Sequence, residues 1–154
     1  MFIPTKEYLF GSLFLLANRL QAVGDTILEE ITLKQWILLV MIFNMDKNKP
    51  SVSEIAEFIG STRQNVRKML DTLATNGYVT LSVSDQDRRS LAVSLTDKTL
   101  FFFRDFESWG SEFLKELFAG IEPDLLEATR YTFETLFNNL EGMKKKYEKI
   151  NSHL

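Results

Sequence analysis

The sequence has no cysteine and a single histidine, His153, among its 154 residues. The absence of cysteine excludes disulfides, thiolate metal sites and a thiol-based oxidation sensor. One histidine leaves no multi-histidine metal site, and the serines and carboxylates lack a histidine base for catalysis. No glycine-rich phosphate-binding loop is present either. We therefore expect neither an enzyme nor a cofactor.

Long apolar runs are also scarce. The longest strongly apolar run near the N-terminus covers residues 8–17, and Gly11 and Ser12 interrupt it. This run is too short to span a bilayer, and no basic leader or obvious cleavage site accompanies it. We expect a soluble cytoplasmic protein without a membrane partner.

The chain does have enough apolar content for one core. Hydrophobic residues make up 45% of it, which suffices for one well-packed domain or for a compact core with dimerisation arms. No internal repeat, low-complexity linker or second domain is visible. We therefore expect residues 1–154 to form a single domain.

Two short helices are predicted side by side in the middle of the chain. Ser51 with Glu54, and Ser61 with Gln64, each fit the capping box that starts a helix. Gly60 can adopt the left-handed conformation that ends the first helix. Apolar residues mark the inner face of that helix: Ile55, Ala56 and Ile59. A turn this tight is what a helix-turn-helix requires.

The second of these helices has one apolar and one polar face. Its apolar residues recur at spacings of three and four: Val66, Met69, Leu70 and Leu73. This periodicity directs four polar residues mostly away from the core: Arg63, Gln64, Arg67 and Lys68. Asn76-Gly77 is expected to stop the helix.

Alternating residues on both sides of residues 85–89 predict a β-hairpin with one buried face. Its buried positions are expected to be Val79, Leu81, Val83, Leu91, Val93 and Leu95. Thr80, Ser82, Ser84, Ala92 and Ser94 fall on the opposite side. Two helices followed by such a hairpin outline a winged helix-turn-helix, so DNA is the expected partner.

The hairpin tip carries two arginines. The planar guanidinium groups of Arg88 and Arg89 suit phosphate oxygens or a narrow groove. Asp85 and Asp87 are expected to shape the turn and orient these arginines, because phosphate repels carboxylates. The alternative is a solvent-exposed turn without DNA contact, in which Asp87 pairs with one of the two arginines.

At these residues the chain resembles the MarR family of bacterial transcriptional regulators. Three motifs carry the resemblance over about residues 30–97: Leu33-x-Gln35-Trp36, Ser53-Glu54-Ile55-Ala56 through Arg67, and Asp87-x-Arg89 leading into Ser94-Leu95-Thr96. The family often has a glycine shortly after the Leu-Thr that closes the wing, whereas Asp97 and Lys98 follow here. Thr96 as a cap, with Asp97 near the positive helix end, is still expected to start a helix.

The resemblance implies a mostly α fold with a small β-hairpin wing. Residues 30–97 would form a winged helix-turn-helix DNA-binding lobe, and residues 1–29 and 98–154 a helical dimerisation region. It also implies a small aromatic or lipophilic effector between these two parts. Tyr8, Phe14, Trp36 and Phe102 would suit its apolar walls, but the spacing singles none of them out. We therefore assign no ligand residues.

Aromatic residues are otherwise interpreted as packing residues. Trp36 is expected in the core or in a pocket wall. Phe101, Phe102 and Phe103 cannot all face one direction on a helix, so at least one is expected at a dimer contact, a cavity or solvent.

Three further helices are expected outside the winged region. One covers about residues 5–28 and has an apolar side: Leu9, Leu13, Leu16, Leu20, Val23 and Ile27. A second runs from about 96 to 119 and ends at Gly120. A third begins near Pro123 and has a seam formed by Leu126, Thr129, Phe133, Leu136 and Leu140. Such a seam packs against another helix, either within the subunit or across a two-fold axis.

Charge is divided unevenly along the chain. The whole chain has a net charge of −3, whereas residues 61–89 hold five cations and three carboxylates and so carry +2. The remainder must carry −5. A basic face on an acidic body would orient the protein toward phosphate. With so few cations per subunit, tight binding is expected to need two subunits.

We assign the DNA contacts by side-chain chemistry. Arg63, Gln64 and Asn65 are expected to read bases in the major groove, because Arg pairs with guanine and Asn or Gln with adenine. The expected phosphate contacts are Thr62, Arg67, Lys68, Ser51 and Ser53. Arg88 is assigned to the minor groove or its flanking phosphates and Arg89 to a structural pair with Asp87, and the alternative is the reverse assignment of these two arginines. The alternative for Arg63, Gln64 and Asn65 is an ordinary exposed helix start that contacts no base. The alternative for Lys68 is a side chain that contacts only solvent.

The sequence thus predicts a homodimeric transcriptional regulator of double-stranded DNA. It would bind a pseudo-palindromic operator with one recognition helix per half-site, and the half-sites would lie about one helical turn apart. We expect repression by blocking polymerase, with activation as the other outcome. The alternative function is a dimeric winged-helix protein-interaction module without DNA binding.

Overall fold

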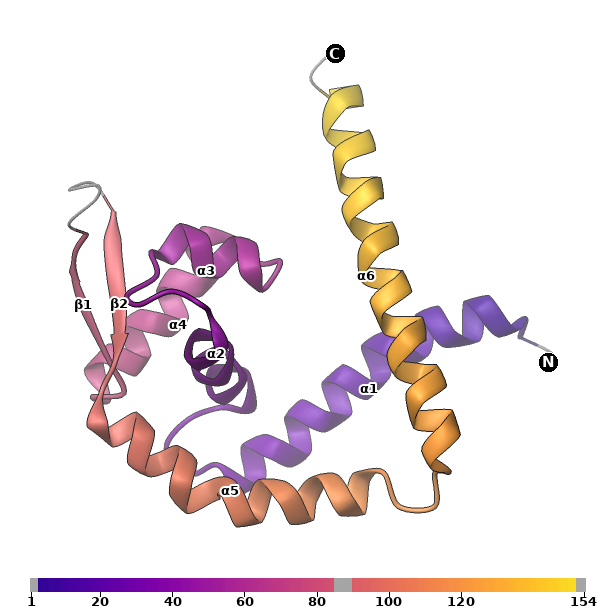
Figure 1. Ribbon diagram of the computed structural model, residues 1–154, viewed down its shortest axis with the longest axis horizontal. Coiled ribbons are helices and arrows are strands. Elements are labelled where there is room, and N and C mark those ends of the chain that lie inside the picture. The colour runs from indigo at the N-terminus through magenta and orange to yellow at the C-terminus, as the bar shows by residue number, and fades with distance from the viewer. Residues whose placement is uncertain (1–2, 85–89, 152–154) are drawn as a thin grey trace. The chain divides into compact units, whose positions relative to one another are not determined.

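The computed structural model describes residues 3–84 and 90–151. The predicted wing residues Asp85, Asp87, Arg88 and Arg89 lie outside the described residues, so their roles stay predictions. The chain forms two compact units, Met1–Phe106 and Glu107–Leu154. Its elements, labelled in Figure 1, are α1 Thr5–Ile27, α2 Leu33–Asn44, α3 Val52–Phe58, α4 Arg63–Thr75, β1 Val79–Val83, β2 Leu91–Leu95, α5 Asp97–Leu117 and α6 Pro123–Asn151.

The core of the first unit is built from α2, α3, α4 and the hairpin. Its side chains with no more than 2% exposure include Leu38, Leu39, Ile55, Val66, Leu70, Leu73 and Val93. Full burial of each such side chain contributes about 1.5–3 kcal/mol relative to exposure. The apolar faces predicted for the two central helices are therefore confirmed, and the described part of the chain is mostly helical with a two-stranded wing.

The turn between α3 and α4 differs by one residue from the prediction. Gly60 has a φ of 66° and donates its N–H to Glu57, while the N–H of Ser61 bonds the Ala56 oxygen at 2.9 Å. These two bonds complete the C-terminal cap of α3, so Ser61 belongs to that cap. Thr62 caps α4 instead, and its hydroxyl accepts the Asn65 N–H at 3.2 Å. The predicted capping box of Ser61 and Gln64 is therefore wrong.

The hairpin pairs antiparallel, with Val79 opposite Leu95 and Val83 opposite Leu91. Its predicted buried face is confirmed at Val79 and Val93, which are buried, whereas Val83 at the end of β1 is 60% exposed. Ala92, predicted on the polar side, is buried at 6% exposure. The segment before α3 explains this burial: Ser51 bridges Ala92, and the Val93 N–H bonds the Pro50 oxygen at 2.9 Å. This segment thus covers the outer edge of β2.

The start of α5 splits its three consecutive phenylalanines as the sequence predicts. Phe102 and Phe103 pack against the core, where Phe102 meets Tyr78 edge to face at 5.5 Å between centroids. Phe101 is 56% exposed and lies under the Arg104 guanidinium at 4.7 Å. Because α5 begins at Asp97, the helix start expected after Thr96 is also confirmed.

The predicted apolar sides of α1 and α6 are largely exposed in the single chain. On α1, Leu9, Leu13, Leu16 and Val23 are 40–56% exposed. On α6, which begins at Pro123 as expected, the exposed apolar residues of the seam are Phe133, Leu136 and Leu140. Among the described residues, no helix combines the length and apolar character needed to cross a membrane.

Candidate nucleic-acid interface

One side of α4 is anchored in the core and the other side is free to meet a partner. Val66, Leu70 and Leu73 have no exposed surface. The polar residues Thr62, Arg63, Gln64, Asn65, Arg67 and Lys68 are all exposed. Each exposed side chain therefore projects from a helix that the core holds in place. This arrangement suits a recognition helix, because the anchored face fixes where the exposed face can reach.

A hollow of about 580 Å³ lies between α4 and β2, and we call it the α4–wing hollow. Its lining residues are Val52, Arg63, Gln64, Arg67, Lys68, Asp71, Thr72 and Leu91. The structure thus brings together four of the six contacts predicted on and before α4. Thr62 and Asn65 are exposed as well, but they do not line this hollow.

Arg67 is held in place on the surface of α4. Its Nε donates to Asp71 Oδ1 at 2.8 Å, one turn further along, and both side chains are about half exposed. Such an exposed pair contributes little to stability. It does restrict the guanidinium to one side of the helix, and the terminal nitrogens of a guanidinium can still donate to a phosphate. Asp71 was not predicted to position a DNA contact.

The start of α3 is a second cluster of predicted contacts. The Ser51 hydroxyl accepts the Glu54 N–H at 3.2 Å, and the Glu54 carboxylate accepts the Ser51 N–H at 2.8 Å. This confirms the capping box predicted there. Ser51 is therefore a structural cap whose hydroxyl proton can also serve a phosphate. Ser53, the second residue of α3, is exposed.

Two lysines of the α2–α3 loop, Lys47 and Lys49, were missed as candidates. With Ser51, Ser53 and residues of the outer wing face, they line a hollow of about 720 Å³. The Lys47 ammonium also donates to the Glu54 carboxylate. This bond and the Ser51 N–H lower the pKa of Glu54 to about 2. The signal in the sequence was the pair of lysines just before the capping box.

Glu54→Gln is expected to lower the free energy of unfolding by about 1 kcal/mol at pH 7, a value discounted for solvent screening of a partly exposed pair. Glutamine keeps the cap but loses the charge that pairs with Lys47. The pKa of Glu54 is lower when folded than its ordinary value of 4.5, so its stabilisation is present above pH 4.5 and lost as the pH falls toward 2.

Urea unfolding of both proteins at pH 7 and pH 3 measures this contribution. The difference in free energy of unfolding between wild type and Glu54→Gln should be smaller at pH 3 than at pH 7, because protonation of Glu54 removes part of its stabilisation in the wild type. Glu57→Gln, an exposed change on the same helix, is the control and should leave stability unchanged at both pH values. If wild type and Glu54→Gln differ in free energy of unfolding by the same amount at both pH values, the stabilising role of the Glu54 charge is contradicted.

Trp36 lies partly buried against the core, which confirms the interpretation of this residue as a packing residue. Its indole Nε1 is buried and has no hydrogen-bond partner within the described part of the chain. Histidine, aspartate and glutamate side chains form no group of three that could hold a metal ion in residues 3–84 and 90–151. Most of the predicted DNA contacts that the structure describes lie on or directly before α4.

Comparisons with known proteins agree with this geometry. A model of the MarR family matches residues 30–90. The uncharacterized HTH-type transcriptional regulator YfiV of Bacillus subtilis is 32% identical over 116 residues, covering 75% of this chain and 71% of YfiV. The HTH-type transcriptional regulator PrsX of Escherichia coli is 29% identical over 145 residues, covering 91% of this chain and 86% of PrsX.

The fold also matches solved structures. The MepR–DNA complex of S. aureus aligns with a TM-score of 0.76 at 21% identity, and the alignment covers 90% of this chain and 99% of MepR. Sequence and fold therefore lead to the same assignment. The chain belongs to the MarR family and is a winged helix-turn-helix, DNA-binding transcriptional regulator.

Proposed function

We propose that the protein binds a pseudo-palindromic operator as a homodimer and represses transcription there. The observation that carries this proposal is the α4–wing hollow, because one anchored helix presents Arg63, Gln64, Arg67 and Lys68 around a single concave surface. Side chains of this kind can read base edges and neutralise phosphates. The MepR structure, which has a similar fold, is a complex with DNA.

The helices that precede and follow the DNA-binding lobe along the sequence support dimerisation. The exposed leucines and phenylalanines of α1 and α6 form apolar surfaces, and such surfaces are commonly protein interfaces. A two-fold dimer would present two copies of α4 to successive major grooves. Each subunit alone has few cations, so two linked subunits gain affinity from a second, intramolecular contact.

Repression would result from binding of the dimer to an operator within a promoter. A dimer that covers two half-sites about one helical turn apart excludes polymerase from a promoter that contains them. Activation is the other outcome, and transcription in vitro from a template carrying the operator distinguishes the two by the direction in which transcript yield changes.

We further propose a small aromatic or lipophilic effector. Next to α5 lies a hollow of about 720 Å³, here called the α5 hollow, whose lining includes Tyr78, Phe101, Phe102 and Phe106. Glu29, Glu30 and Asp105 outnumber Lys98 among its charged residues, so a neutral or cationic aromatic suits it better than an anion. Such a ligand would lower DNA affinity if it favoured a dimer with wrongly spaced recognition helices.

Salt dependence of DNA binding tests the proposed function. If Arg67, Lys68 and one wing arginine neutralise phosphates, a dimer makes about six such contacts, and its affinity should fall about 10³-fold between 50 and 200 mM salt. Fluorescence anisotropy with a labelled operator duplex measures this slope, and repeating the titration with small aromatic compounds tests for an effector. Binding that changes less than about threefold over this range would instead indicate a largely apolar protein interface.

A further inference from the structure

The hairpin has a hollow on each of its two faces. Leu91 of β2 lines the α4–wing hollow, whereas its neighbours Ser90 and Ala92 line the hollow of about 720 Å³ that also contains Lys47 and Lys49. Successive residues of a strand point to opposite faces, so the hairpin separates the two hollows. We call the second one the outer wing hollow. Its described lining lies entirely within the first unit.

The outer wing hollow is rich in hydroxyl groups and carries a positive charge. Five of the described residues that line it are serines: Ser51, Ser53, Ser82, Ser84 and Ser90. Its charged groups are two lysines and one glutamate, so the described lining has a net charge of +1. Because Lys47 pairs with Glu54, this charge belongs to Lys49, whose ammonium has no partner among the described residues. Lysine and serine side chains bind phosphate oxygens and distinguish no base.

The chain holds Lys49 beside the hairpin. Its φ of 58° lies in the left-handed region, which is uncommon for a residue other than glycine and persists where the surrounding structure determines it. The next residue, Pro50, is buried and its oxygen accepts the Val93 N–H at 2.9 Å. Ser51 then bridges Ala92. Lys49 therefore leaves the loop directly beside the outer edge of β2.

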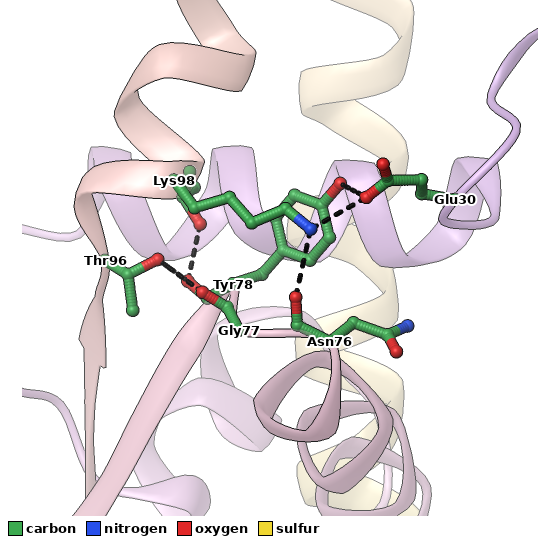
Figure 2. Close-up of polar contacts among 7 residues, drawn as sticks. Glu30, Asn76, Gly77, Tyr78, Thr96 and Lys98 are labelled. Carbon is green, nitrogen blue, oxygen red and sulfur yellow. Dashed lines mark hydrogen bonds and ion pairs between the residues drawn. The ribbon is translucent and has the colours of Figure 1, made fainter.

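The base of the hairpin is fastened to the rest of the first unit. Directly before β1, the Tyr78 hydroxyl donates to Glu30 Oε2 at 2.8 Å, and the Lys98 ammonium donates to the same oxygen at 2.8 Å. Directly after β2, the Thr96 hydroxyl lies within donating distance of the Gly77 oxygen, at 2.7 Å. Figure 2 shows these bonds around the two ends of the hairpin. They hold both hairpin faces in a set position beside α4.

The thickness of the hairpin indicates what the outer wing hollow can reach. A strand layer with side chains on both faces is about 10 Å thick, and the phosphates of one DNA strand follow each other at about 3.4 Å. A duplex that lies against α4 and continues past the hairpin would therefore present phosphates to the outer wing hollow about three base pairs beyond those on the α4 side.

We propose that Lys49, together with Ser53 and Ser82, binds phosphodiester groups of the DNA that flanks each half-site. This inference rests on the proposed function, because it requires operator DNA to lie against α4. The contact is made within one subunit and adds affinity without base preference. Base reading is left to the start of α4, on the other face of the hairpin.

The test compares operator duplexes that differ only in the length of the flanking DNA. The duplexes extend 0, 3, 6 or 9 base pairs beyond the outer edge of each half-site and are titrated by fluorescence anisotropy. Lys49→Gln removes the ammonium and keeps the side-chain stem, and Ser82→Ala removes a hydroxyl of the hollow. Lys34→Gln is the matched control, because Lys34 is an exposed lysine at the other end of the 12-residue α2, about 18 Å from the loop.

Wild type and Lys34→Gln are expected to gain about tenfold in affinity when the flank grows from 0 to 6 base pairs. In Lys49→Gln this gain should fall below about threefold, and in Ser82→Ala it should be intermediate, while the affinity for the duplex without flanks stays within twofold of wild type. The salt slope on the long duplex should fall by about one per lost contact. A thermal unfolding scan shows that each variant remains folded.

A second experiment locates the contact. One flanking phosphate at a time is replaced by a methylphosphonate, which has no charge. At the contacted phosphates this change should weaken binding by wild type and leave binding by Lys49→Gln unaltered. Replacements on the α4 side should weaken binding by both proteins equally.

Three results would overturn the inference: a wild type that gains nothing from flanks, a Lys49→Gln that keeps the full gain, and a Lys49→Gln that loses the same factor on every duplex. Inorganic phosphate that raises the thermal midpoint of wild type alone, with an unchanged flank gain in Lys49→Gln, would instead indicate a site for a small anion. In each case the proposed function stands, because wild type still binds the operator. Wild-type protein that binds no duplex would remove both proposals.

Discussion

Replacing Arg63 with alanine is expected to change which operators the protein prefers, with a loss of about 1–3 kcal/mol at one base pair. Arg63 is the first residue of α4 and lines the α4–wing hollow. A guanidinium at that position can pair bidentately with guanine O6 and N7, and alanine cannot. Affinities for an operator and its single-base variants, measured for both proteins, should show that discrimination disappears at one position in each half-site.

Arg88→Ala is the variant with which the changed operator preference of Arg63→Ala is compared. Arg88 is assigned to the minor groove or its flanking phosphates, so its loss should weaken binding to all operators by a similar factor and reduce the salt slope by about one per lost contact. Lys115→Ala, an exposed change on α5, should alter neither property. Equal, sequence-independent losses from Arg63→Ala and Arg88→Ala would refute this division of roles.

A pair of aspartates on α1 should separate the subunits of the proposed homodimer and lower operator affinity by at least about 100-fold, because bivalent binding is lost. Leu9 and Leu16 lie two helical turns apart and are 53% and 56% exposed in the single chain. Burying unpaired aspartates in an interface is costly. The variant Leu9→Asp with Leu16→Asp is therefore expected to sediment as a monomer at concentrations at which we expect wild type to sediment as a dimer.

The same substitutions should leave the fold of each subunit intact, because neither leucine belongs to the buried core. The thermal midpoint by circular dichroism checks this. Asn18→Asp adds a carboxylate to the same helix at a position that is already polar and exposed, and it should remain dimeric. A double variant that stays dimeric and binds the operator at wild-type affinity would contradict the role of α1.

Much of this fold could be predicted because its signals are local. The capping box of Ser51 and Glu54, the left-handed Gly60 and the periodicity of α4 each involve residues within one or two turns. The one-residue error at Ser61 has a local cause as well. Both Ser61 and Thr62 suit a helix cap, and two bonds of the folded chain decide between them: the Ser61 N–H donates to the Ala56 oxygen, and the Thr62 hydroxyl accepts the Asn65 N–H.

Contacts between distant residues could not be predicted in this way. Glu30 is 48 residues from Tyr78 and 68 from Lys98, and no periodicity relates them. Ala92 is buried because Ser51 bridges it across the fold, which strand alternation alone cannot indicate. The exposed seams on α1 and α6 were identified as helix-packing surfaces, and sequence periodicity does not say whether the neighbouring helix belongs to the same chain or to a second copy.

Selection from random duplex DNA by the purified protein tests the central claim most directly. Retained duplexes are sequenced, and the enriched sequence is titrated against salt. We expect a palindrome with half-sites about one helical turn apart and an affinity that falls steeply as salt rises. Enrichment of no sequence, or binding that is insensitive to salt, would contradict a dimeric, sequence-specific regulator.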